Sequence, residues 1–176
     1  EMGGKNAIVV DQDDVPENLR FLPGAEGVIK RPPEGFKAEA AVVLDCPVKE
    51  RVGKVSSEVD KAEAVINIDH HVSNEYFGDL NWVEPAASSV GEMLFELACA
   101  SGVVVDKDMA VLMYTAIVTD TGMFNYANTK EGTHRIAGEL LRLGVEPKAV
   151  HRQIYENRSE HEVRLLGRVL STTTGR

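Results

Sequence analysis

Short apolar runs separated by polar segments fill the first half of the chain. Three of them, at residues 6–10, 40–44 and 64–68, are rich in β-branched side chains. Such runs are typical of strands that are buried in a parallel sheet. The segment 15–33 is rich in proline and glycine and indicates turns, while the other connections are long enough for crossover helices. This pattern predicts an α/β fold with a mainly parallel sheet flanked by helices.

The second half has a helical period instead. Between residues 88 and 101, apolar side chains recur every three or four positions, Ser88 or Ser89 can cap the start, and Gly102 can end the helix. Further helices are expected at residues 108–118, 133–143, 147–155 and 160–170. The chain therefore predicts a sheet-containing part followed by helices.

The two ends of the chain suggest domain boundaries. Gly3 and Gly4 stand just ahead of the first expected strand, as glycines do after a helix, although no helix precedes them. We therefore expect the natural domain to begin before residue 1. Residues 1–170 would belong to this domain, and the polar residues 171–176 would start a linker.

The charge limits the partners. The formal net charge is −9 and no stripe of Lys and Arg stands out, which argues against a grip on long duplex nucleic acid. Small phosphorylated substrates stay open, because bound metal ions can supply positive charge. No apolar run reaches the roughly 18 residues of a membrane span, no signal peptide is evident, and Cys46 and Cys99 form no paired motif. The sequence predicts a cytoplasmic protein without a membrane partner.

Two carboxylates follow apolar runs that are expected to be strands. Asp45 comes directly after the run at 40–44, and Asp69 comes directly after the run at 64–68. In open α/β sheets, binding sites form at the carboxyl ends of the strands. Each aspartate taken alone could simply form a turn. Two such residues, one of them followed by histidines, favour a site.

The segment Asp69-His70-His71 is the densest group of potential metal ligands in the chain. Carboxylate oxygen and neutral imidazole nitrogen together suit Mn²⁺ and related ions. Neighbouring side chains of an extended segment point to opposite sides, so we expect one histidine to bind metal and the other to face the substrate. Asp69 would orient an imidazole. The alternative is a pair of ordinary loop histidines.

Asp120 follows the apolar run of an expected helix. The carboxyl end of a helix disfavours an acid, and a bound cation is the simple compensation. The alternative is a turn-forming aspartate ahead of Gly122.

Together these segments resemble a known family. Residues 42–45, 68–71 and 116–124 resemble the second, third and fourth motifs of the DHH phosphoesterases, and the resemblance runs from about residue 6 to about residue 170. The segments at 81–85, 88–92 and 133–137 look like the branch of oligoribonucleases (nanoRNases) and phosphoadenosine-phosphate phosphatases.

The resemblance implies a site with two Mn²⁺ ions. Asp45 would bridge the ions, and His70 and Asp120 would bind the second one. His71 would contact the scissile phosphate, and Asp69 would hold the histidines from behind. The ions would clamp the phosphate while a water attacks phosphorus. Arg158 is a weaker candidate for binding substrate phosphate.

The chain departs from the family at both ends. The first motif, His-x-x-x-Asp-x-Asp, is absent, and the acidic segment 11–14 follows the wrong strand to replace it. The family's C-terminal substrate-binding domain, which carries a glycine-rich His motif, is also absent from this sequence. We therefore expect a fragment that holds only part of the ligand set.

The expected function is Mn²⁺-dependent hydrolysis of short oligoribonucleotides, of 3′-phosphoadenosine 5′-phosphate, or of both. The alternatives are another DHH activity, namely that of a pyrophosphatase, an exopolyphosphatase or a cyclic-dinucleotide phosphodiesterase, and a non-catalytic nucleotide-binding module. The sequence does not determine the oligomeric state, and a homodimer stays an open alternative.

Overall fold

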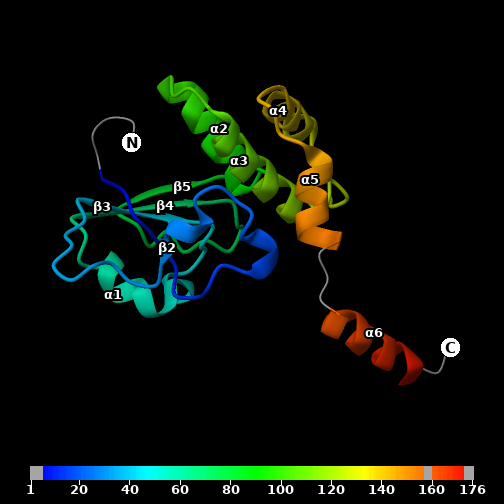
Figure 1. Ribbon diagram of the computed structural model, residues 1–176. Helices are drawn as coiled ribbons and strands as arrows, with labels where there is room; N and C mark the ends of the chain where they lie inside the picture. The colour runs from blue at the N-terminus through cyan, green and yellow to red at the C-terminus, as the bar shows by residue number, and fades with distance from the viewer. Residues whose placement is uncertain (1–5, 157–159, 173–176) are drawn as a thin grey trace.

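A three-stranded parallel sheet forms the platform of the molecule. The structure, a computed structural model, describes residues 6–156 and 160–172 (Figure 1). Strands β3 (Ala40–Leu44), β4 (Ala64–Asp69) and β5 (Leu80–Val83) pair in the order β3-β4-β5. Leu44 lies opposite Ile68, and Asp69 lies opposite Val83. The carboxyl ends of all three strands therefore meet at one edge, as expected of a parallel sheet.

A second, smaller sheet lies near the amino terminus. It consists of β1 (Val9–Val10) and β2 (Val28–Ile29), which are also parallel. Short 3₁₀ turns at Glu17–Leu19 and Ala25–Gly27 precede β2. The connection from β3 to β4 contains another 3₁₀ segment at Lys49–Val55 and a single turn of helix, α1 (Ser56–Val59).

Helices make up the rest of the described chain. They are α2 (Val90–Ser101), α3 (Lys107–Asp120), α4 (Glu131–Arg142), α5 (Pro147–His151), which continues as a π-helical turn at Arg152–Glu156, and α6 (Glu160–Thr172). In Figure 1, α2 and α3 lie above the sheet, α1 lies below it, and α6 lies apart from the other helices. Among the described residues, no helix is both long and apolar enough to cross a membrane.

Two apolar clusters hold these layers together. Ile68 of β4 packs with Ala87, Val90 and Met93 and so joins the sheet to α2. A larger cluster joins α2, α3, α4 and α5, with Ile117, Ile136 and Leu140 fully buried at its centre. Helix α2 belongs to both clusters, and it therefore places the sheet edge against the carboxyl end of α3.

The predicted α/β architecture with a parallel sheet is confirmed, and so are most helices. The Ser89 side chain accepts from the Glu92 amide, and Gly102 ends α2 in a left-handed conformation. The strands were predicted less well. The strand expected at 6–10 covers only Val9–Val10, β2 lies in the segment that was assigned to turns, and β5 was not predicted. These strands have two or four residues, so their formation depends on a pairing partner more than on local pattern. The helix expected at 147–155 changes to a π-helical turn at Arg152.

Candidate functional site

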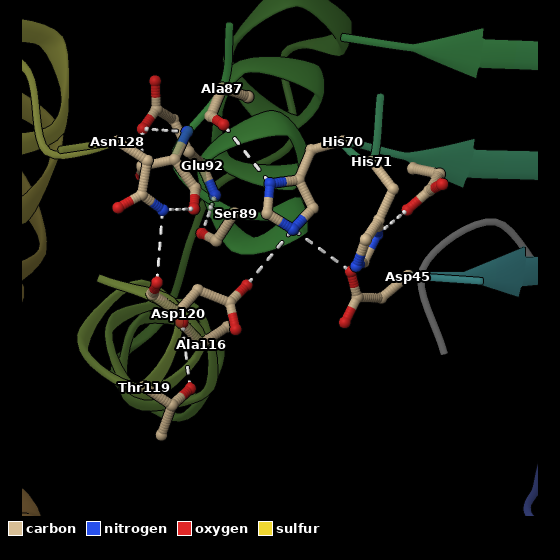
Figure 2. Close-up of polar contacts among 12 residues, drawn as sticks. Asp45, His70, His71, Ala87, Ser89, Glu92, Ala116, Thr119, Asp120 and Asn128 are labelled. Carbon is tan, nitrogen blue, oxygen red and sulfur yellow. Dashed lines mark hydrogen bonds and ion pairs between the residues drawn. The ribbon is translucent and has the colours of Figure 1, made fainter. Parts of the chain in front are cut away.

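Asp45 occupies a left-handed position directly after β3. Its φ angle is 55°, which aspartate tolerates better than most residues. Its amide donates to the Ile68 carbonyl at 3.0 Å, so the ladder between β3 and β4 extends by one residue. The conformation costs on the order of 1 kcal/mol. It turns the carboxylate, which is 48% exposed, toward the two histidines after β4 (Figure 2).

His70 stands between two carboxylates. Its Nε2 lies 3.3 Å from an Asp45 oxygen and 3.6 Å from an Asp120 oxygen, and the side chain is only 15% exposed. Its Nδ1 lies 3.3 Å from the Ala87 carbonyl oxygen. Because a carbonyl oxygen can only accept, Nδ1 carries the proton, and in the neutral ring the Nε2 lone pair faces the carboxylates. The contact with Asp45 raises the pKa of His70, burial opposes this, and the Ala87 carbonyl adds to the increase.

The two histidine rings converge. We expected His70 and His71 to point to opposite sides, and this is wrong: their ring centroids are 4.9 Å apart and the rings meet at 65°. The reason is that β4 ends at Asp69, so the alternation of an extended strand does not continue through the histidines. His71 Nδ1 lies 3.6 Å from the same Asp45 oxygen that faces His70.

Asp69 is fully buried and holds His71. One carboxylate oxygen lies 2.8 Å from His71 Nδ1, and the other accepts from the Asn74 amide at 2.6 Å. The same Asn74 nitrogen donates to the buried Asn67 side chain. Burial alone would raise the pKa of Asp69, but the hydrogen bonds from Asn74 and His71 outweigh it and hold the pKa below its usual value. Asp69 is therefore ionised and fixes the orientation of the His71 ring.

Asp120 is the last residue of α3, and its carboxylate faces His70. Its pKa is raised to about 6, first by burial and then by the charge of Asp45, with His70 and His71 opposing the increase. The turn that follows is tight: Gly122, Met123 and Phe124 all have positive φ angles between 53° and 63°. The Thr121 hydroxyl fastens this turn by accepting from the Phe124 amide at 3.1 Å.

The donor set fits a divalent cation. Ligand atoms of Asp45, His70 and His71 lie within 4.8 Å of one another, and Asp120 lies on the opposite side of His70 Nε2. Two carboxylates facing neutral imidazole nitrogen match the preference of Mn²⁺ and similar ions. A cation would also offset the repulsion between Asp45 and Asp120 that raises the Asp120 pKa. The structure thus brings together four of the predicted site residues and places Asp69 behind them, whereas Arg158 lies outside the described residues.

Several supporting residues were missed by sequence reasoning. Asn74 positions Asp69, and the Asn128 amide donates to the carbonyls of Ser88 and Asp120 at 3.0 and 3.1 Å. An isolated asparagine in a loop carries no local signal of such a role. Glu92, in the first turn of α2, accepts from the amide of Ser88 in the loop that faces His70.

Known proteins and a family model are similar to this chain. The model of the DHH family, N-terminal domain, matches residues 6–117. The bifunctional oligoribonuclease and PAP phosphatase NrnA of Thermus thermophilus is 38% identical over 163 residues, and the match covers 90% of this chain and 48% of that protein. The Bacillus subtilis protein of the same name is 34% identical over 71% of this chain and 40% of its own length.

A solved structure is also similar. An exopolyphosphatase-related protein from Bacteroides fragilis superposes with a TM-score of 0.85 and 27% sequence identity, over 96% of this chain and 53% of that one. The chain therefore spans roughly half the length of the relatives that it matches.

Proposed function

Because the chain belongs to the DHH family, we propose that it forms the catalytic part of a Mn²⁺-dependent phosphoesterase that acts on short oligoribonucleotides, 3′-phosphoadenosine 5′-phosphate, or both. The observation that carries the proposal is the convergence of Asp45, His70 and Asp120 beside the pair of His71 and Asp69. The relatives named as oligoribonuclease and PAP phosphatase support the choice of substrate.

Each residue has a distinct part in this proposal. Asp45, His70 and Asp120 would hold Mn²⁺, with two ions in the complete site. The ions would polarise the phosphoryl group and lower the pKa of water at the site. When His71 carries both protons, Nδ1–H donates to the ionised Asp69 and Nε2–H is left to donate to a phosphoryl oxygen. Asp69 stabilises that cation and keeps its ring in place.

The sheet supports the proposal that further chain completes the site. β3 is one of the two outer strands of the three-stranded sheet among the described residues, and its Val42 and Leu44 are 54% and 45% exposed. An open strand edge beside exposed apolar side chains is suited to an additional strand. We propose that a segment with the family's first motif adds at this edge and brings the remaining carboxylates. A C-terminal substrate-binding domain would follow residues 171–176.

The function is tested by comparing substrates on the full-length natural protein with Mn²⁺. We expect a diribonucleotide and 3′-phosphoadenosine 5′-phosphate to be hydrolysed at least about tenfold faster than pyrophosphate. His71→Ala should lower kcat by about 100-fold, the low end of the usual contribution of a positioned proton donor. The matched control is His161→Ala, which removes an exposed histidine of α6 and should leave kcat unchanged.

Other results would favour the alternatives. Faster hydrolysis of pyrophosphate, polyphosphate or a cyclic dinucleotide would move the protein to another DHH activity. Among these alternative substrates, we would test polyphosphate first, because one similar structure is that of an exopolyphosphatase-related protein. Binding of nucleotide without turnover of any of these substrates would indicate a non-catalytic module. A homodimer also stays a prediction, and sedimentation velocity would test it.

A further inference from the structure

Glu92 makes an unusual set of contacts in the first turn of α2. One oxygen of its carboxylate accepts from the Ser88 amide at 3.2 Å, from the Ser88 hydroxyl, and from the Thr133 hydroxyl at 3.1 Å. The carboxylate therefore faces the loop that enters α2 and the start of α4. It makes no direct contact with the metal-binding residues, and the proposed function gives it no role.

The Ser88 amide connects Glu92 to His70. A peptide unit is planar, with its N–H and C=O groups pointing in opposite directions. In the peptide between Ala87 and Ser88, the Ser88 N–H donates to Glu92. The Ala87 carbonyl of the same peptide accepts from His70 Nδ1 at 3.3 Å. The contact with Glu92 thus sets the direction in which the Ala87 carbonyl points. A continuous line of hydrogen bonds runs from the carboxylate through one peptide to the imidazole.

We propose that Glu92 is a positioning residue for His70 and acts through the Ala87–Ser88 peptide. This inference rests on the proposed function, in which His70 Nε2 holds a metal ion. The carboxylate polarises the peptide, the polarised carbonyl holds the proton on His70 Nδ1, and Nε2 keeps its lone pair for the cation. Metal-binding histidines commonly donate to a carboxylate or a carbonyl directly, whereas here the carboxylate acts through one intervening peptide.

The rest of the loop is fastened in a consistent way. The Lys130 ammonium donates to the Ala86 carbonyl at 2.6 Å, and the Asn128 amide donates to the Ser88 carbonyl. Because the Ala87 carbonyl accepts from His70, each of the three carbonyls from Ala86 to Ser88 has a hydrogen-bond donor. Asn128 also donates to the Asp120 carbonyl, which ties this loop to the end of α3. The peptide between Glu92 and His70 has little freedom to rotate.

A plain structural role for Glu92 makes a different prediction. As an acid at the amino end of α2 that also contacts Thr133 of α4, Glu92 stabilises the helix start and joins two helices. Its loss would then lower thermal stability and nothing else. The state of the His70 ring separates the two roles, because a simple helix cap has no effect on which ring nitrogen carries the proton.

The test uses Glu92→Gln, which keeps the shape of the side chain and removes its charge. The ¹⁵N chemical shifts of the His70 ring are measured in the metal-free protein, and the affinity for Mn²⁺ is measured by titration calorimetry. We expect Nδ1 of the wild-type ring to carry a proton that donates to the Ala87 carbonyl, and the fraction of rings protonated at Nδ1 to fall in the variant. We also expect Mn²⁺ affinity to fall by about tenfold, which is the low end of the loss seen when a residue that orients a metal ligand is mutated.

A control variant matches the loss of a helix cap. Asp106 caps α3 by accepting from the Met109 amide at 2.8 Å, and Asp106→Ala should lower stability without changing the His70 ring or Mn²⁺ affinity. Glu92→Asp, which keeps the charge but shortens the side chain, serves if Glu92→Gln does not fold, and it should shift the ring in the same direction. An unchanged His70 ring in the Glu92 variant would overturn the proposal. A wild type that binds no Mn²⁺ would instead contradict the proposed metal site, while the ring measurement still decides the role of Glu92.

Discussion

At the scale of single residues, the buried carboxylate of Asp120 is suited to binding Mn²⁺ but destabilises the metal-free protein. Its carboxyl pKa is raised from 3.8 to about 6, first by burial and then by Asp45. For a carboxyl whose pKa is higher in the folded state, the contribution to stability is fully present below the unfolded pKa and is lost as the pH rises through the folded pKa. The metal-free protein is therefore destabilised by Asp120 as the pH rises from about 4 to above 6.

Asp120→Asn should stabilise the metal-free protein at pH 7 and weaken Mn²⁺ binding. The gain comes from removing a poorly solvated charge, and we expect roughly 1–2 kcal/mol after allowing for the partial exposure of the side chain. Urea denaturation from pH 4 to 8 without metal measures the gain, which should vanish near pH 4. Calorimetric titration with Mn²⁺ at pH 7 measures the loss of affinity.

The matched control is Asp108→Asn, which neutralises an exposed acid at the other end of α3. It should change neither the pH dependence of stability nor the Mn²⁺ affinity by a comparable amount. In the wild type, Mn²⁺ affinity should fall by up to about tenfold per pH unit below pH 6, because the metal must displace a proton from Asp120. Equal Mn²⁺ affinity for wild type and Asp120→Asn would remove Asp120 from the set of ligands.

At the scale of elements, the close crossing of α2 and α3 sets the geometry of the site. Gly91 lies at this crossing, and a Cβ atom there would come within 2.7 Å of the Met113 carbonyl oxygen and 2.8 Å of the Ala116 Cβ. Helix α2 follows the Ala87 carbonyl that faces His70, and α3 ends at Asp120. The separation of the two helices therefore controls how far Asp120 lies from His70.

Gly91→Ala should push these helices apart. We expect a loss of stability of about 1–3 kcal/mol, the usual cost of overpacking, together with weaker Mn²⁺ binding. The control is Gly138→Ala in α4, where an added Cβ meets nothing within 4 Å. That change should raise stability by about 0.4–1 kcal/mol and leave Mn²⁺ binding unchanged. Thermal unfolding and Mn²⁺ titration of both variants test this, and a Gly91→Ala protein as stable as wild type would contradict it.

At the scale of the whole molecule, two exposed surfaces stand out among the described residues. The first is the β3 edge, and the second is α6, on which every described side chain is exposed. Apolar residues gather on one face of α6, including Val163, Leu166 and Val169, each at least 45% exposed. Exposed apolar surface of this kind is typical of an interface. Both surfaces agree with the proposal that this domain works within a larger protein.

The number of bound Mn²⁺ ions tests that proposal. With Asp45, His70 and Asp120 as its ligands, the 176-residue chain should bind one Mn²⁺ ion, whereas a protein that also carries the first motif should bind two. Titration calorimetry on both proteins measures the difference. Two tight sites on the 176-residue chain alone would show that the remaining ligands come from another part of this sequence or from a second copy.

What the sequence determined by itself follows from local rules. Asp45 and Asp69 end apolar runs that form parallel strands, and such carboxylates meet at one sheet edge. Ser89 and Gly102 mark the ends of α2 because capping depends on neighbouring backbone groups. These features involve residues close together in the chain, so the pattern of residue types was sufficient to place them.

Only the tertiary structure decided which groups support the site. The Ala87 carbonyl faces His70, and Asn128 joins Ser88 to Asp120. Glu92 of α2 accepts from Thr133 of α4. These contacts join segments far apart in the chain, and asparagine, glutamate and backbone carbonyls are too common to signal them in advance. The convergence of the histidine rings was likewise decided by the end of β4 and by the buried Asp69. Hydrogen bonds of this kind depend on direction, and direction comes only from packing.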